Sequence, residues 1–143
     1  MPRLIVSPDA AKRIIRRRRR LGLDRKDEVW DGVYVMAPDP NTHHQLLVGR
    51  LTYALTAALG DRQDIQVLPG GNVSDQEFNW TKSYRCPDVL VVLPGCSAED
   101  RGSHLFGGPD FAVEIVSPGD RSRHSPLGFW LAVELARVLS VLR

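Results

Sequence analysis

Residues 111–116 read Phe111-Ala-Val-Glu-Ile-Val116, an apolar run interrupted by one central carboxylate. A second run, Asp88-Val-Leu-Val-Val-Leu93, is continuously apolar after its leading acid. Runs of this kind are typical of interior strands that are covered on both faces. An ionised carboxylate is expensive to bury alone, so Glu114 predicts a cation, a set of donors or a metal beside it. Asp88 taken alone could be a strand-end residue, but the two acids together favour a hard-cation site.

The segment upstream of these strands predicts a basic N-terminal helix. Ser7-Pro8-Asp9 combines an N-cap residue, a proline in the first turn and an acid at the positive helix end. The helix should run to about Leu21 and end near Gly22. Six arginines lie between Arg13 and Arg20 and step around every face of this helix. They indicate either a nucleic-acid contact or a solvated arm.

A hairpin and a second helix should follow. Residues 28–30 and 33–36 predict two short strands around an Asp31-Gly32 turn. Asn41 can cap a helix that runs to about Leu59 and ends at Gly60. Its apolar residues recur at helical spacing and predict a buried stripe, made of Leu47, Leu51, Leu55, Ala58 and Leu59.

The remaining segments carry weaker signals. Residues 65–68 suggest a strand, Gly70-Gly71 a turn, and residues 74–83 and 95–108 two loops. Leu127–Leu142 is apolar but short for a bilayer and contains two charged residues, so a buried or partner-covered helix is expected and no membrane association.

Composition limits the class of protein. The 143 residues suffice for one domain, and 43% hydrophobic with 25% charged residues is ordinary for a soluble globular protein. A net charge of +2 does not by itself imply a polyanionic partner. Cys86 and Cys96 lack metal-site spacing and are expected to be reduced thiols in a cytoplasmic protein.

Several motifs together resemble the Uma-two family of restriction-endonuclease-like proteins, a branch of the PD-(D/E)XK nucleases. They are Asp31-Gly32, His44-Gln45 at a helix start after a proline-rich loop, Tyr84-Arg-Cys-Pro-Asp-Val-Leu-Val-Val92, and Phe106-Gly-Gly-Pro-Asp-Phe-Ala-Val-Glu-Ile-Val-Ser-Pro-Gly-Asp120. The last run is the most specific. The resemblance covers about residues 28–123.

The resemblance implies an α/β fold with a restriction-endonuclease-like core, in which a mixed central sheet is flanked by helices. It implies Mg²⁺-dependent hydrolysis of DNA phosphodiester bonds, with Mn²⁺ as a substitute metal. Asp88, Glu114 and the carbonyl of Ile115 would hold the metal, and His44 could be an acid–base group or a phosphate contact. A homodimer is compatible with this interpretation.

The sequence also departs from the family pattern. The motif lysine would fall at Val116, and the only lysines are Lys12, Lys26 and Lys82. After Arg123 the family's amphipathic helix and closing strand are lost, which suggests a truncated or frame-shifted tail. We therefore divide the chain into a basic N-terminal helix or arm (1–27), a nuclease-like core (28–123) and an atypical apolar C-terminal helix (124–143).

Two further functions compete with an impaired endonuclease. One is a catalytically degenerate nucleic-acid-binding or interaction protein, and the other is a non-functional fragment. Arg121 and Arg123 could clamp a phosphate or be solvated loop residues. Gly107-Gly108 lacks a P-loop lysine and is interpreted as a turn.

Overall fold

The computed structural model describes residues 7–60, 62–116 and 130–134, without the side chains of Val116 and of residues 130–134. The helical elements are α1 (Pro8–Leu21), α2 (Thr42–Leu59) and the short 3₁₀ helix η1 (Trp80–Lys82). The strands are β1 (Glu28–Trp30), β2 (Val33–Val35), β3 (Gln66–Leu68), β4 (Val73–Ser74), β5 (Val89–Val92), β6 (Glu99–Asp100), β7 (Leu105–Phe106), β8 (Phe111–Val116) and β9 (Trp130–Glu134).

A four-stranded mixed sheet forms the centre of the fold, in the order β3-β5-β8-β9. The β3–β5 and β5–β8 pairs are antiparallel, and the β8–β9 pair is parallel. The two apolar runs that carry the acids are therefore neighbours, with Val89 opposite Val113. The predicted mixed α/β architecture is confirmed.

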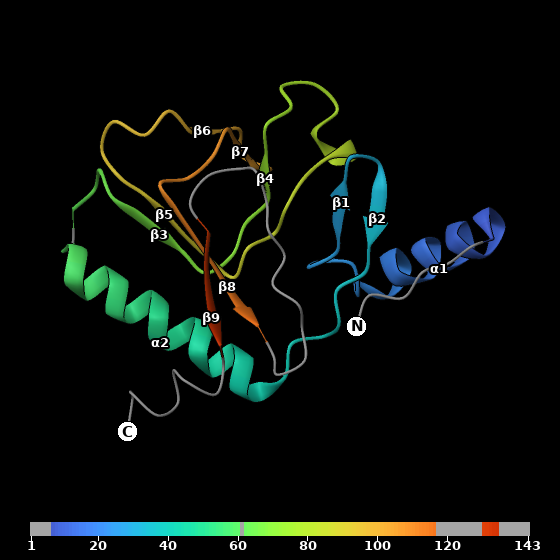
Figure 1. Cartoon of the computed structure of the whole chain (residues 1–143), viewed down its shortest axis with the longest axis horizontal. Helices are drawn as coiled ribbons and strands as arrows, with labels where there is room; N and C mark the ends of the chain where they lie inside the picture. The colour runs from blue at the N-terminus through green and yellow to red at the C-terminus, as the bar shows by residue number, and fades with distance from the viewer. Residues whose placement is uncertain (1–6, 61, 117–129, 135–143) are drawn as a thin grey trace.

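Side chains alternate between the two faces of this sheet and form two cores. Val89, Val113 and Ile115 pack with Leu47 and Val48 of α2. The residues between them point the other way, and a second cluster there joins β5 and β8 to β4 and β7. Figure 1 shows α2 lying along the sheet and the β4–β7–β6 strands gathered near one end of it. Among the described residues, α2 covers one face, while the small β4–β7–β6 sheet packs on the other.

The predicted loop at residues 95–108 contains two short strands that the sequence pattern did not predict. β6 and β7 lie within it, and β7 pairs in parallel with β4, which lies at the start of the predicted loop 74–83. Each of these strands has only two residues, so no alternation was available to predict them. Their apolar residues Val73 and Leu105 are buried against the central sheet, which explains the pairing.

The C-terminal helix prediction is wrong for the five residues that the structure describes there. Residues 130–134 form β9, which runs parallel to β8 from Ala112↔Trp130 to Val116↔Glu134. Pairing with β9 satisfies backbone groups along the second edge of β8, which an isolated helix could not do. The rest of residues 124–143, with Arg121 and Arg123, lies outside the described residues.

The local signals nearer the N-terminus are confirmed. Ser7 caps α1, and Gly22 ends it in a left-handed conformation. β1 and β2 pair around Asp31-Gly32, whose positive φ values of 47° and 84° are those that a tight two-residue hairpin requires. Asn41 caps α2 through His44 N, and Gly60 ends the helix. Within the predicted stripe, Ala58 is exposed, and Val48 is buried in its place.

Candidate functional site

Asp88 is the centre of the candidate site. The carboxylate is buried, with 6% of the residue exposed, and it lies one residue before β5. Its Oδ2 accepts a hydrogen bond of 2.9 Å from Ile115 N, and its own N–H donates to Val113 O at 3.0 Å. Because Pro87 has no N–H, the β5 ladder ends here, and the carboxylate satisfies an edge donor of β8. The sequence-predicted acid is thus built into the sheet.

Glu114 lies in β8 between Val113 and Ile115, the two residues whose backbone groups bind Asp88. Val113 and Ile115 pack against α2, so Glu114 leaves the sheet from the face that also carries Ala112. Asp88 lies one residue before β5, so strand alternation does not fix the direction of its side chain. The hydrogen bonds of Asp88 with Val113 O and Ile115 N place its backbone beside Glu114. Convergence of their carboxyl groups stays a prediction.

His44 lies beside Asp88, as its candidate role required. Its Nε2 is 3.0 Å from Asp88 Oδ2, although the two residues are 44 positions apart. Asn41 fixes the first turn of α2 by accepting a 2.9 Å hydrogen bond from His44 N. The Nδ1 atom is buried and, within the described part of the chain, has no hydrogen-bond partner. His44 can therefore orient the Asp88 carboxylate, while Nδ1 stays unsatisfied.

Lys26 is the site residue that sequence analysis missed. Its Nζ lies 3.7 Å from Asp88 Oδ1, on the carboxylate oxygen that His44 and Ile115 do not use. The lysine precedes β1 and is 62 residues from Asp88 (88 − 26). No motif marks it, because the family pattern directs attention to the residues after Glu114. Only the fold brings its ammonium to the acid.

The residues around Lys26 hold it in place. Asp27 accepts hydrogen bonds from both Arg18 and Tyr34, and Glu28 accepts one of 2.8 Å from Cys86 N. Both acids are buried. The backbone at Lys26 is therefore fixed to α1 on one side and to the segment that leads into Asp88 on the other.

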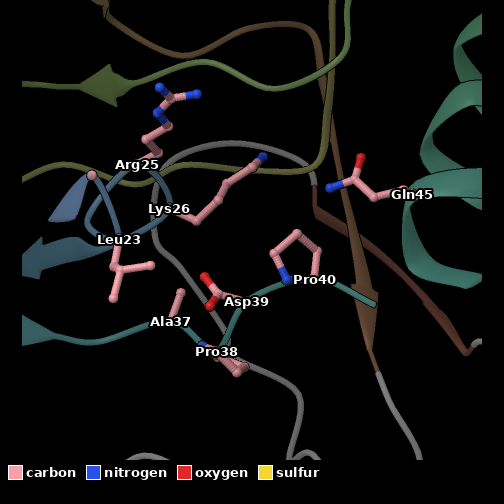
Figure 2. A pocket seen from close by; sticks show the side chains of 9 residues that line it. Leu23, Arg25, Lys26, Ala37, Pro38, Asp39, Pro40 and Gln45 are labelled. Atoms are coloured by element: carbon pink, nitrogen blue, oxygen red, sulfur yellow. The ribbon is translucent and has the colours of Figure 1, made fainter. Parts of the chain in front are cut away.

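A pocket of about 220 Å³ opens beside Lys26. Figure 2 shows Lys26 and Gln45 extending toward this pocket from opposite sides, with Asp39 and Pro40 on the loop between β2 and α2. Arg25 and Asp39 also line this pocket. The pocket has space for a small anionic group, and it adjoins the residue that contacts Asp88.

The basic helix α1 is docked onto the fold. Arg18 is the exception within the arginine block, because its guanidinium binds both oxygens of the buried Asp27 at 2.7 Å. Of the two alternatives for the arginine block, the solvated arm therefore does not hold at Arg18. The cations exposed along α1 are Lys12, Arg13, Arg16, Arg17, Arg19 and Arg20. They form a positively charged surface on an anchored helix.

The implied metal can be tested against these residues. Carboxylate oxygens suit Mg²⁺, which is often held by one or two carboxylates plus water and phosphate. Among the described residues, however, no three acidic, histidine or cysteine side chains are grouped closely enough to hold a metal. Asp88 also carries Lys26 and His44 as neighbours. The carboxylates are thus of the donor type that Mg²⁺ takes, but the described residues form no preformed cage for it.

The two thiols take no part in the site. Cys86 and Cys96 are free. Burial raises the pKa of the Cys86 thiol, which keeps it protonated and unreactive near neutral pH. No helix in the described ranges is long and apolar enough to cross a membrane.

The mixed sheet, with its two acid-bearing segments side by side and α2 on one face, defines a restriction-endonuclease-like core. Residues 17–125 match the model of the Uma2 (Uma-two) family, described as "Putative restriction endonuclease". The chain belongs to this family.

A solved structure supports the same fold. The crystal structure of a protein titled a putative nuclease belonging to DUF820, from Anabaena variabilis, aligns with a TM-score of 0.52 at 15% identity. The alignment covers 66% of this chain and 52% of that one, so the chain spans about half the length of that protein. A comparison with curated proteins found no match.

Proposed function

We propose that this chain is a slow, Mg²⁺-dependent endonuclease that hydrolyses DNA phosphodiester bonds at Asp88 and Glu114. The observation that supports it most directly is the buried Asp88 carboxylate, which lies next to Lys26 and His44 and accepts a hydrogen bond from Ile115 N, the residue after Glu114. Membership of a restriction-endonuclease family gives this cluster its chemical interpretation.

In this proposal the chain's own groups have separate roles. Asp88 and Glu114 hold Mg²⁺, with the Ile115 carbonyl as a further ligand, and His44 orients Asp88. A bound Mg²⁺ would polarise the scissile phosphate and lower the pKa of the attacking water. Lys12 and the exposed arginines of α1 hold the DNA backbone by phosphate contacts, which makes affinity fall as salt rises.

The proposed rate is low because the motif lysine is replaced by Val116. A lysine at this position can orient the attacking water and stabilise charge that develops on the phosphate. Loss of one such preorganised contact typically costs about 10²–10³ in rate. An apolar side chain supplies neither effect. We expect Val116→Lys to accelerate single-turnover cleavage if the tail is not also limiting.

The alternative is a nucleic-acid-binding protein that has lost catalysis, which the valine at position 116 favours. Nicking of supercoiled plasmid with Mg²⁺, Mn²⁺ or EDTA separates the two functions. Metal-dependent nicking that disappears in both Asp88→Ala and Glu114→Ala supports the endonuclease. Salt-sensitive DNA binding without nicking at any metal concentration would instead identify the binder.

A further inference from the structure

Lys26 has the placement of a substrate-contacting cation. Its Nζ is 3.7 Å from Asp88 Oδ1, which is longer than the 2.7–3.2 Å of an ordinary N–H···O hydrogen bond. About a third of its side chain, 32%, is exposed, and it lines the pocket shown in Figure 2. Its ammonium is thus electrostatically paired with Asp88 yet able to donate hydrogen bonds outward.

The two oxygens of Asp88 have different neighbours, and Oδ1 lies 3.7 Å from Lys26 Nζ. Ile115 N and His44 Nε2 both lie within 3.0 Å of the same carboxylate oxygen, so that oxygen has two partners already. A lysine kept only to neutralise a buried acid would be expected to close to hydrogen-bond distance. Arg18 does so with Asp27, at 2.7 Å. The longer distance between Lys26 Nζ and Asp88 Oδ1 leaves the ammonium able to contact a second anionic group.

The surroundings keep the ammonium at this point. A Cβ at Gly70 would lie 2.8 Å from Lys26 Nζ, so the absence of a side chain there makes room for the ammonium. On the other side, Asp27 and Glu28 are fixed by buried hydrogen bonds. An ammonium held beside a carboxylate and at a pocket edge is preorganised for an anionic oxygen, and preorganised charge is the form that accelerates phosphate chemistry.

We propose that Lys26 contacts the phosphate of the nucleic-acid substrate and supplies the positive charge that Val116 cannot supply at the motif position. This inference rests on the proposed nuclease function. It assigns the role to a residue upstream of the hairpin that no motif marks. The residual cleavage of this chain then depends on a lysine recruited from the segment between α1 and β1.

The first test is single-turnover plasmid nicking with Mg²⁺ by Lys26→Gln and by the matched control Lys82→Gln, whose lysine is exposed on η1. Lys26→Gln should cleave about 10²-fold more slowly or worse, and Lys82→Gln at the wild-type rate. Lys26→Arg should recover part of the rate because it restores the charge. Equal rates in wild type and Lys26→Gln would overturn the inference.

A second measurement does not depend on turnover. Binding of a short fluorescent DNA duplex in Ca²⁺ is followed as a function of salt. Loss of one phosphate contact should reduce the slope of log affinity against log salt by about 0.9 in Lys26→Gln and leave it unchanged in Lys82→Gln. An unchanged slope in Lys26→Gln would refute the phosphate contact. Absence of wild-type nicking with a changed slope would reject the endonuclease function and retain the contact.

Discussion

Asp27 and Asp88 are both buried aspartates, but the groups around their carboxylates differ. Asp27 is 1% exposed and binds Arg18 through both oxygens, Tyr34 through its hydroxyl at 2.5 Å and Ala37 through its N–H at 2.9 Å. Asp88 is 6% exposed, and its cationic neighbour stays at 3.7 Å beside a pocket. A fully satisfied acid ties elements together, whereas a partly satisfied acid at an opening can still bind something else.

This comparison shows why burial of a carboxylate is a poor guide to function when taken alone. The hydrogen bonds of Asp27 join α1 to the hairpin and to the loop that follows β2. The Asp88 carboxylate brings together Lys26, His44 and Ile115 from three distant segments, and among the residues that the structure describes its Oδ1 has only the longer contact with Lys26. The number and closeness of the donors, together with access to a pocket, separate an anchor from a candidate site.

The largest expected effect is on the anchor. Arg18→Ala leaves the Asp27 carboxylate buried without its cation, and breaking such a pair typically costs about 3–5 kcal/mol. We expect a loss of this size in the free energy of unfolding from urea denaturation. Arg17→Ala removes an exposed arginine from the same helix and should change stability by less than about 0.5 kcal/mol. Equal losses in the two variants would contradict the anchor role.

The counterpart at the site is Asp88→Asn, which keeps the shape and an oxygen for Ile115 N but removes the charge. We expect metal-dependent nicking to fall by about 10²–10³-fold or more, with a smaller loss of stability than in Arg18→Ala. Plasmid nicking and urea denaturation on the same preparation measure the two effects. A variant that cleaves normally would place the metal elsewhere, and one that unfolds would make Asp88 a second anchor.

A smaller effect is expected at His44, which acts through Asp88. Residues that orient a ligand typically contribute about 10–100-fold in metal affinity or activity. His44→Ala should weaken Mn²⁺ binding in calorimetry by about that factor. His43→Ala changes the exposed neighbour on the same helical turn and should bind Mn²⁺ as the wild type does. Identical affinities in the two variants would count against an orienting role.

The smallest effect concerns the pH dependence of the anchor. Burial and the hydrogen bond to Asp27 raise the pKa of Tyr34. The unfolded chain therefore releases the Tyr34 proton first, at about pH 10, and the free energy of unfolding should fall as pH rises above that value. Tyr34→Phe should show a shallower fall. The comparison is made by urea denaturation between pH 8 and 11, and parallel curves would show that Tyr34 does not contribute.

Much of the fold could be predicted because its signals are local. The ends of α1 and α2 follow from Ser7, Gly22 and Asn41, which satisfy backbone groups within a few residues of themselves. The Asp31-Gly32 turn likewise specifies its own backbone conformation. The apolar runs around Glu114 and after Asp88 marked the two interior strands and the candidate acids. Each of these inferences needed fewer than ten consecutive residues.

Other features depended on contacts between distant segments. β7 pairs with β4 and β6, and β9 pairs with β8. β6 and β7 have two residues each and carry no pattern of their own. Arg18 looked like its neighbours in the arginine block until the fold placed Asp27 against it. No sequence pattern marked Lys26, because its proposed role depends on its distance to Asp88 in the fold.

The sequence by itself determined the local elements, the two acids and the family to which the chain belongs. Tertiary structure alone decided which arginine is an anchor, that the last described segment is a strand, and that a lysine stands beside Asp88. The physical reason is the range of the interactions. Caps, turns and alternation act within one segment, whereas ion pairs and strand pairing join groups whose separation along the chain carries no information about their separation in space.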